Sequence, residues 1–313
     1  MKYILRKTGA LLATVLIISL LAFLAFQVIP GDPTTKMLGS DATPERVAAL
    51  RAQLGLDRSI AVRYFEWLKG FVVGDMGTSY SYSISVNDLL GNKVVVTASL
   101  SALAFLMVIG ISIPVGIAMA RWSGKWIEKV FQVLNQITMA VPSFLIGIIF
   151  NYVLGLVLRL FTPGEFISYN ESFWGFLGYL VFPALAIALP KSAMVIKLLC
   201  SSIMKEMRQD YVRTAYSRGN SRWETLSIHV LRNAIMPVIT FMASTLSSIV
   251  AGSIIIEQVF SIPGIGRLLL LSISNRDFPV VQAIVVMIAF LVVFVNFIAD
   301  ILYQCIDPRV RLA

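Results

Sequence analysis

The sequence predicts an all-α membrane protein with six transmembrane helices. Of its 313 residues, 58% are hydrophobic and only 14% are charged, which is more apolar side chain than a soluble core of this length can hide. Six uncharged stretches are each long enough to cross about 30 Å of hydrocarbon as a helix. None alternates with a period of two residues, which favours helices over a membrane barrel. The stretches are residues 8–30, 94–120, 130–158, 172–190, 233–256 and 278–299.

The first stretch follows Lys2, Arg6 and Lys7, an arrangement that also occurs in secretory signal peptides. Its apolar part is longer than that of a typical signal, and no A-x-A cleavage site follows. We therefore expect residues 1–30 to be a cytoplasmic end and a retained first helix. Cys200 and Cys305 have no ligand-spaced companions, so neither a disulfide framework nor a metal site is predicted.

Charge predicts the orientation, because cytoplasmic segments carry an excess of Lys and Arg. With both termini in the cytoplasm, the short outer loops hold only Arg159, Arg267 and Arg276. The long segment 31–93 has balanced charge and contributes little to the prediction. The predicted inner segments hold Lys2, Arg6, Lys7, Arg121, Lys125, Lys129, Lys197, Lys205, Arg208, Arg213, Arg218, Arg222, Arg232, Arg309 and Arg311.

The outer segment 31–93 reads as short amphipathic helices near the membrane surface. Thr43 can cap a helix with Pro44 at its first position, and Gly55 can end it. A second amphipathic piece covers residues 61–74. Packing against the transmembrane bundle and docking of an external partner are both compatible with this pattern.

Residues 94–313 are expected to form a five-helix core whose spans contain four proline residues. Such residues kink transmembrane helices and are tolerated where backbone lines a cavity. Lys191 is the one charge within a span; it either snorkels to the inner interface or faces a translocation path. The proline residues are Pro114, Pro142, Pro183 and Pro190.

The longest inner connection, residues 197–232, carries the signals of two helices joined at a glycine. Asp210 can cap a helix that begins at Tyr211, and Gly219 suits the left-handed position that ends it. Ser221 and Glu224 fit the S-x-x-E capping box of a second helix. The connection therefore reads as a helix–glycine–helix elbow, although its basic residues could instead bind anionic headgroups. The expected buried stripe of the second helix is Trp223, Leu226 and Val230.

The sequence DYVRTAYSRG at 210–219, followed by LRNAIMPVIT at 231–240, resembles the EAA loop of ABC importer permeases. It is most similar to the dipeptide/oligopeptide/nickel family. Matching motifs cover nearly the whole chain in the right order. They are VIPGDP at 28–33, QLGLD at 53–57, GDMGTS at 74–79, EQVFSIPGIGRLL at 257–269, RDFPVVQA at 276–283 and DPRVRL at 307–312.

The resemblance implies the ABC type I importer permease fold, in a bacterial or archaeal cytoplasmic membrane. The elbow would be the coupling helix that docks on an ATP-binding subunit. Its contact residues would be Asp210, Tyr211, Val212, Arg213, Thr214 and Ala215, with Gly219 as the bend. The outer mouth would be shaped by Glu257, Phe260, Pro263, Gly264 and Gly266, which could equally form an ordinary Pro-Gly turn.

No catalytic or metal-binding constellation is predicted, and the chain lacks a P-loop because Gly124-Lys125 is followed by Trp126. ATP and Mg would be used by partner subunits, and this chain would need no cofactor. The implied partners are a homologous second permease, two ATP-binding subunits, an extracytoplasmic solute-binding protein and membrane lipid, with no nucleic acid. Di- or oligopeptides are the expected cargo, with nickel or glutathione as alternatives. A stand-alone secondary transporter and a membrane scaffold are the rival interpretations.

Overall fold

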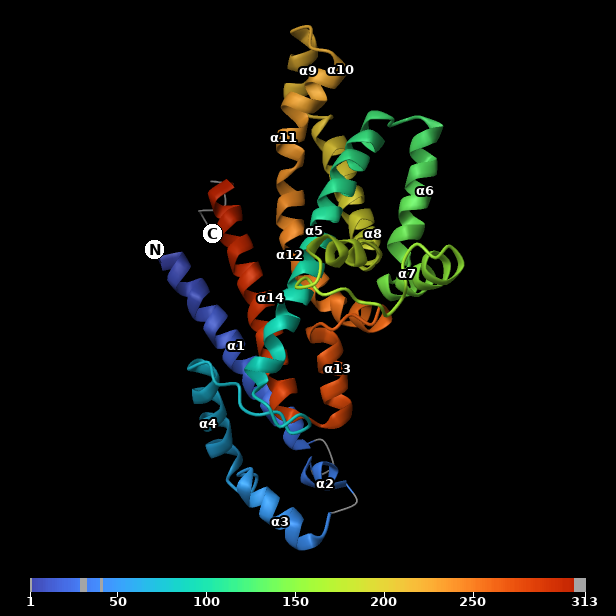
Figure 1. The fold of residues 1–313 in the computed structure, drawn as a ribbon. Helices are drawn as coiled ribbons and strands as arrows, with labels where there is room; N and C mark the ends of the chain where they lie inside the picture. The colour runs from blue at the N-terminus through green and yellow to red at the C-terminus, as the bar shows by residue number, and fades with distance from the viewer. Residues whose placement is uncertain (1, 29–32, 40–41, 307–313) are drawn as a thin grey trace. The chain divides into compact units, whose positions relative to one another are not determined.

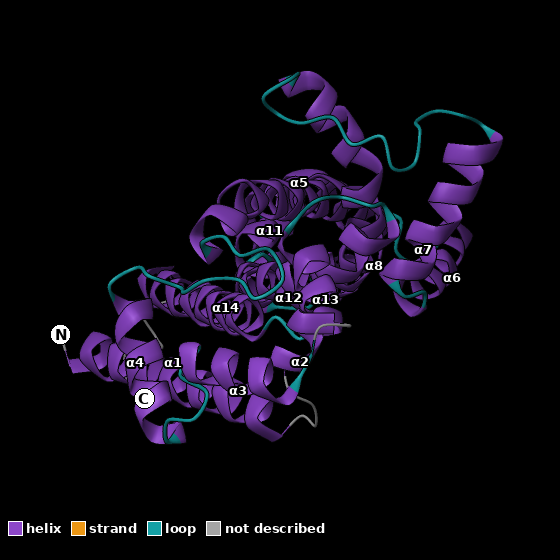
Figure 2. Cartoon of the chain, turned by 60° about the horizontal axis from the view of Figure 1, so that its bottom comes forward, coloured by secondary structure: helices purple, strands orange, loops and turns teal. Residues whose placement is uncertain are grey.

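The structure is a computed structural model that describes residues 2–28, 33–39 and 42–306. These residues form helices and loops, with one isolated bridge between Thr78 and Ser85 and no strand (Figure 2). The all-α prediction is confirmed. The α-helices are α1 Lys2–Val28, α2 Pro33–Leu38, α3 Pro44–Gln53, α4 Ile60–Val72, α5 Val86–Arg121, α6 Trp126–Ala140, α7 Ser143–Phe150, α8 Phe173–Glu206, α9 Asp210–Ser217, α10 Arg222–Glu224, α11 Leu231–Ala234, α12 Met236–Val259, α13 Ile265–Asn275 and α14 Phe278–Ile306; η2 Asn151–Val157 and η3 Thr225–Val230 are π-helices (Figure 1).

Five helices among the described residues, α1, α5, α8, α12 and α14, are long and apolar enough to cross a membrane. The predicted span 130–158 is different, because α6 and the α7–η2 helix meet at an angle of 94°. The break is at Val141, which has extended backbone with ψ of 123°, and at Pro142. Proline lacks an N–H and disfavours helical backbone in the residue before it, which ends α6 here. The described chain therefore has six spans only if this bent pair counts as one.

The chain divides into two compact units. Unit 1 contains Met1–Thr97 and Pro263–Phe294, and unit 2 contains Ala98–Ile262 and Val295–Ala313. Both α5 and α14 continue from one unit into the other.

In unit 1, the helices of the predicted outer segment begin and end close to the expected residues. The Thr43 hydroxyl accepts a hydrogen bond from the Arg46 N–H at 3.4 Å, and Gly55 has a φ of +65° just after α3. The next helix, α4, packs on α1 through a hydrogen bond of 2.9 Å between the hydroxyls of Tyr64 and Ser19. Phe23, Tyr64 and Trp67 form an aromatic cluster beside that bond. This contact supports packing against a transmembrane helix for α4.

A buried carboxylate fixes the loop that follows α4. Asp277 accepts hydrogen bonds from the Ser79 hydroxyl at 2.5 Å, the Tyr80 N–H at 2.9 Å and the Ser81 N–H at 3.1 Å. We call this arrangement the Asp277 clamp. Burial raises the pKa of the nearby Tyr80 phenol, which therefore stays protonated. The clamp brings the GDMGTS and RDFPVVQA segments together within unit 1.

In unit 2, α8 is the central helix and packs against α6, α7 and α12. Sixteen of its residues are buried, among them Pro183 and Pro190, and the helix continues through both. Two side chains bond to the end of α12: the Tyr179 hydroxyl donates to the Phe260 carbonyl at 2.7 Å, and the Asn151 amide donates to the Val259 carbonyl at 2.8 Å. These bonds satisfy carbonyl groups that the end of a helix leaves without partners.

Candidate functional site

The elbow, residues 210–234, is formed by α9, a glycine turn and the helical run of α10, η3 and α11. It lies between the end of α8 and the start of α12 (Figure 1). The connection begins later than predicted, because α8 continues to Glu206. The predicted cap is wrong by one residue: Gln209 is the N-cap and Asp210 is the first residue of α9. Asp210 lies instead 3.8 Å from the Arg213 guanidinium, in an exposed contact one helical turn along.

Gly219 ends α9 as predicted, with a φ of +87°. The Gly219 N–H donates to the Tyr216 carbonyl at 2.9 Å, and the Asn220 N–H donates to the Ala215 carbonyl at 3.3 Å. This pair of bonds is the Schellman motif, in which a left-handed residue lets two N–H groups turn back onto the last helical turn. A side chain at position 219 would meet no atom within 4 Å, so the backbone conformation is what selects glycine.

The second limb begins with the predicted capping box. The Glu224 N–H donates to the Ser221 hydroxyl at 3.2 Å, and the Ser221 N–H donates to the Glu224 carboxylate at 2.7 Å. The backbone N–H of Ser221, and second its hydroxyl, hold the pKa of the Glu224 carboxyl below its usual value. A further bond of 3.2 Å joins the Asn220 amide to Nε2 of His229. The turn is therefore fixed to both limbs by short-range bonds.

The predicted buried stripe of the second limb is wrong at one position. Leu226 and Val230 are buried, but Trp223 is 48% exposed and lies against the Arg121 guanidinium, 5.1 Å from the ring centre. The reason is η3, whose wider π-helical turn changes which residues share a face. Ala234 becomes the next buried residue along that face.

The first limb has one buried and one exposed face. Val212 and Ala215 are buried, whereas Arg213 and Thr214 are exposed. Tyr211 is partly exposed, and its hydroxyl donates to the Glu206 carboxylate at 2.8 Å. Burial raises the pKa of the Tyr211 phenol, so the hydroxyl keeps the proton it donates. The predicted contact residues are therefore divided between the two faces.

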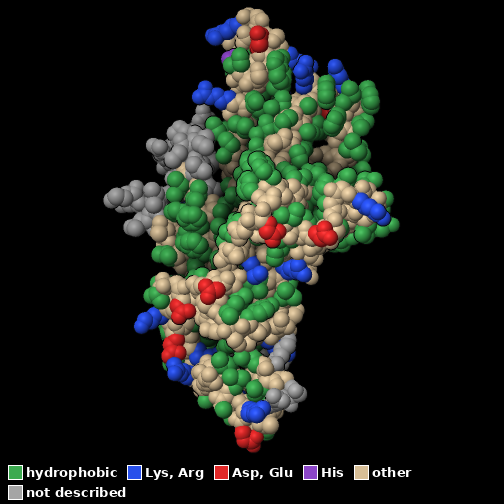
Figure 3. Space-filling model, in the orientation of Figure 1, with side chains coloured by type: hydrophobic (Ala, Val, Ile, Leu, Met, Phe, Trp, Pro, Cys, Tyr) green, Lys and Arg blue, Asp and Glu red, His purple; other side chains and the backbone are tan. Residues whose placement is uncertain are grey.

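Basic side chains surround the end of unit 2 that carries the elbow, as the blue groups in Figure 3 show. Such a surface suits a protein partner or anionic headgroups. The exposed basic residues there include Lys205, Arg208, Arg213, Arg218, Arg222 and Arg232.

The predicted outer-mouth residues fall in different units. Glu257 and Phe260 are fully buried in unit 2, where the Glu257 carbonyl accepts the Ile262 N–H at 2.8 Å. Pro263, Gly264 and Gly266 belong to unit 1, where Gly264 is the N-cap of α13. Pro263 and Gly264 line a cavity of about 260 Å³ in that unit, together with Tyr82, Lys93 and Arg267.

Lys191 lies directly after Pro190 in the middle part of α8 and is partly exposed. Within the part of the chain that the structure describes, its ammonium group has no ion-pair partner. The described residues likewise contain no group of three or more His, Cys, Asp or Glu placed to hold a metal ion. A path-lining role for Lys191 stays a prediction.

Two further cavities, each with a mixed polar and apolar lining, were not predicted from the sequence. One, of about 430 Å³ in unit 1, is lined by Arg58, Arg63, Glu66 and Trp67 among others. The other, of about 300 Å³ in unit 2, is lined by polar residues of α6 and α8 together with Met119, Cys200 and Met204. The only sequence signal for the second was the spacing of Glu128, Gln132 and Gln136, four residues apart on one helix face.

Comparisons with known proteins agree with the resemblance. Residues 112–312 match the family described as binding-protein-dependent transport system inner membrane component, and residues 1–101 match the N-terminal component of the same systems. A relative from Brucella abortus, named as a permease protein of a peptide transport system, is 35% identical over 308 residues, 98% of each chain. A peptide ABC transporter permease from Sinorhizobium fredii is 31% identical, over 99% of each chain. The glutathione transport system permease protein GsiC of Salmonella choleraesuis is 30% identical, also over 99% of each.

These matches cover nearly the whole chain, and they include the elbow as well as the apolar helices. Two independent properties, the motifs and the helical spans, thus lead to one family. The chain therefore belongs to the binding-protein-dependent transport system inner membrane component family, as a multi-pass bacterial inner-membrane permease of the dipeptide/oligopeptide ABC importers.

Proposed function

We propose that the chain forms half of a translocation path for di- or oligopeptides, which operates by alternating access and is driven by ATP that partner subunits hydrolyse. The observation that carries this proposal is the elbow, whose bonds make it a short rigid projection with an exposed face. Arg213 and Thr214 on that face are available to an ATP-binding subunit. The names of the relatives from Brucella abortus and Sinorhizobium fredii support peptides as the cargo.

The coupling step needs an element that transmits movement without deforming. The Schellman bonds at Gly219 and the capping box at Ser221 satisfy the backbone groups on both sides of the turn. The buried side chains of Val212 and Ala215 fix the first limb to unit 2. Closure of two ATP-binding subunits would therefore move the elbow and its neighbouring helices as one body.

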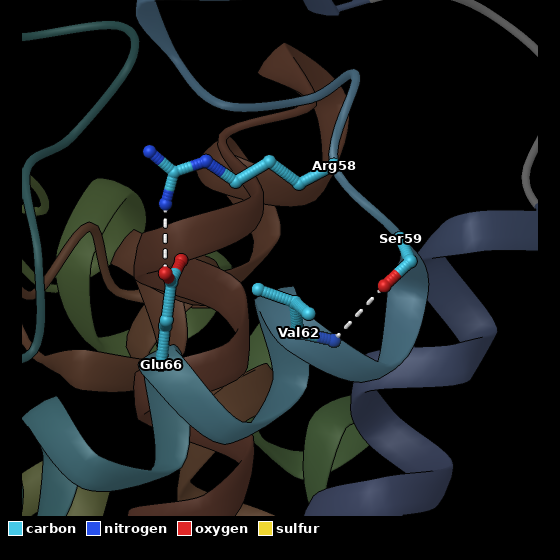
Figure 4. Close-up of polar contacts among 4 residues, drawn as sticks. All are labelled: Arg58, Ser59, Val62 and Glu66. Carbon is cyan, nitrogen blue, oxygen red and sulfur yellow. Dashed lines mark hydrogen bonds and ion pairs between the residues drawn. The ribbon is translucent and has the colours of Figure 1, made fainter.

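The remaining partners are a homologous second permease and an extracytoplasmic solute-binding protein. The cavity of about 430 Å³ in unit 1 supports docking of the solute-binding protein, because it combines charged and aromatic side chains on the predicted outer segment. Arg58 donates to the Glu66 carboxylate at 2.7 Å across one edge of this cavity, and Ser59 caps α4 beside it through the Val62 N–H (Figure 4). We assign Pro263 and Gly264 to the path entrance, supported by the cavity that they line in unit 1.

Peptide uptake into proteoliposomes tests the proposal, with the chain present alone or together with its second permease, ATP-binding subunits and solute-binding protein. We expect uptake only in the complete system, and only with ATP. A cysteine at Thr214 should crosslink to an ATP-binding subunit, whereas a cysteine at Glu45, in the predicted outer segment, should not. Uptake by the isolated chain, or no crosslink in an assembled complex, contradicts the proposal.

Glutathione is the second candidate cargo, because the relative from Salmonella choleraesuis is named for glutathione transport. Competition in the same vesicles separates the two. Unlabelled glutathione should compete weakly with trialanine if peptides are the cargo, and strongly if glutathione is. Nickel uptake by the complete system, with neither trialanine nor glutathione taken up, would contradict both.

A further inference from the structure

The cavity in unit 2 lies between the end of α5, the helix α6 and the helix α8, and we call it the inner cavity. Its volume is about 300 Å³, at the lower end of the range for small-molecule sites. Its polar lining comes from two membrane helices, where uncompensated polar groups are costly and are usually functional. The polar residues that line it are Glu128, Gln132, Asn135, Gln136, Lys197 and Ser201.

The two sides of α6 differ sharply in chemistry. Glu128, Gln132, Asn135 and Gln136 follow the spacing of one helix face, and that face borders the inner cavity. Val133 and Ile137 lie on the opposite side and are exposed, as are other apolar residues there. An amphipathic helix of this kind places its apolar side toward lipid and its polar side toward a wet interior. Gln132 and Gln136 on the cavity side are exposed as well, so the polar face of α6 borders a water-accessible cavity rather than lipid.

The helix α8 contributes a positive charge to the same cavity. Lys197 lies nine residues before the end of α8 at Glu206, about 13 Å along the helix at 1.5 Å per residue. It is therefore on the helix wall and not in the connecting loop, where the sequence alone had placed it. Among the residues that the structure describes, none forms an ion pair with its ammonium group.

The existing hydrogen bonds show which groups can receive a ligand. The Glu128 carboxylate already accepts bonds from the Gly124 N–H at 2.7 Å and the Gln132 amide at 2.9 Å. The Asn135 amide donates to the Ala193 carbonyl at 2.9 Å, which ties α6 to α8. Lys197 and the Gln136 amide thus offer donors toward the cavity, while Glu128 and Asn135 keep α6 in place.

We propose that the inner cavity binds a short peptide during its passage, with Lys197 contacting the terminal carboxylate and Gln136 the peptide backbone. A lysine ammonium and a carboxylate form a charge-assisted hydrogen bond, and a primary amide can both donate to and accept from a peptide group. Contacts of this kind select for a peptide terminus and ignore side-chain identity. The inference rests on the proposed transport function and adds the site and the two residues that would contact the peptide.

Equilibrium binding of radiolabelled trialanine to the purified complex, without the solute-binding protein, tests this site. Trialanine and its C-terminal amide differ only in the charge that Lys197 would contact. We expect the wild-type complex to bind trialanine at least about tenfold more tightly than the amide. Lys197→Met should weaken trialanine binding by about the same factor and bind both compounds equally, while Lys197→Arg should keep most of the preference.

Lys129→Met is the matched control, because Lys129 is an exposed lysine next to Glu128 on α6 that does not line the cavity. It should leave trialanine binding unchanged. Equal losses in Lys197→Met and Lys129→Met would overturn the site in favour of a general charge effect. ATP-dependent trialanine uptake without measurable binding, or with binding that ignores Lys197, would overturn the site and leave the proposed function standing. Failure of peptide uptake in the complete system would instead contradict the proposed function.

Discussion

The elbow and the Asp277 clamp both hold a sharp reversal of the chain, but their bonds span very different sequence distances. The bonds of the elbow join residues three to nine positions apart, such as Ser221 with Glu224 and Asn220 with His229. The bonds of the clamp join residues 196 to 198 positions apart. A local motif forms as soon as its own segment folds, whereas the clamp forms only after the C-terminal part of unit 1 is present.

Of the substitutions that compare the two regions, Asp277→Ala should lower the free energy of unfolding most, because Asp277 is fully buried. The substitution leaves the Ser79 hydroxyl and two N–H groups without their acceptor, which costs about 3–5 kcal/mol. We expect a lower unfolding temperature in detergent and faster protease cleavage between residues 74 and 85, with an unchanged elbow. Asp75→Ala is the control, since the Asp75 carboxylate is exposed and accepts the Gly77 N–H at 2.9 Å. Equal effects of the two substitutions would contradict a larger contribution of the clamp to stability.

Gly219→Val comes next and should abolish uptake while membrane insertion continues. A β-branched residue in the left-handed conformation costs about 1–2 kcal/mol and forces the turn to change. Gly219→Asn, which tolerates this conformation, should retain part of the uptake. Gly164 has a φ of +89° and equally open surroundings, so Gly164→Val carries the same strain outside the elbow. Normal uptake by Gly219→Val would refute the elbow as the coupling element.

Ser221→Ala removes a helix cap and should have a smaller effect, about 1 kcal/mol. Ser59 provides the corresponding cap in unit 1, where its hydroxyl accepts the Val62 N–H at 3.4 Å. Both substitutions should loosen their own helix start, as measured by hydrogen exchange. Only Ser221→Ala should also raise the ATP consumed per peptide transported. If Ser59→Ala raised the ATP consumed per peptide as much, the effect would not be specific to the elbow.

Lowering the pH should have the smallest effect on the stability of the elbow, and only in the acidic range where Glu224 is protonated. The pKa of Glu224 is lowered in the folded state, so its contribution is present above the unfolded value of about 4.3 and disappears as pH falls through the folded value. We expect the Ser221 amide to be protected from exchange at pH 6 and to lose that protection below about pH 4. Comparison with Glu224→Gln at each pH corrects for the intrinsic pH dependence of exchange. Identical curves for the two proteins would contradict the prediction.

The same contrast explains which features sequence reasoning could find. The caps at Thr43 and Ser221 and the bend at Gly219 were predictable, because each depends on a few neighbouring residues. Asp210 and Trp223 were placed wrongly, the first because α9 begins one residue earlier and the second because a π-helix shifts the buried face. The Asp277 clamp and the inner cavity depend on which segments meet in three dimensions. A single sequence does not show which distant positions come into contact.

The break at Pro142 has a consequence for how the protein is made. Residues 126–157 are apolar enough to enter the bilayer as a single hydrophobic segment, yet they finish as two helices bent by 94°. The bond that holds α7 and η2 in place runs from Asn151 to Val259, a residue synthesised 108 positions later. Pro142 can end α6 as soon as this segment folds, but the second arm gains its bond to Val259 only after α12 has been synthesised.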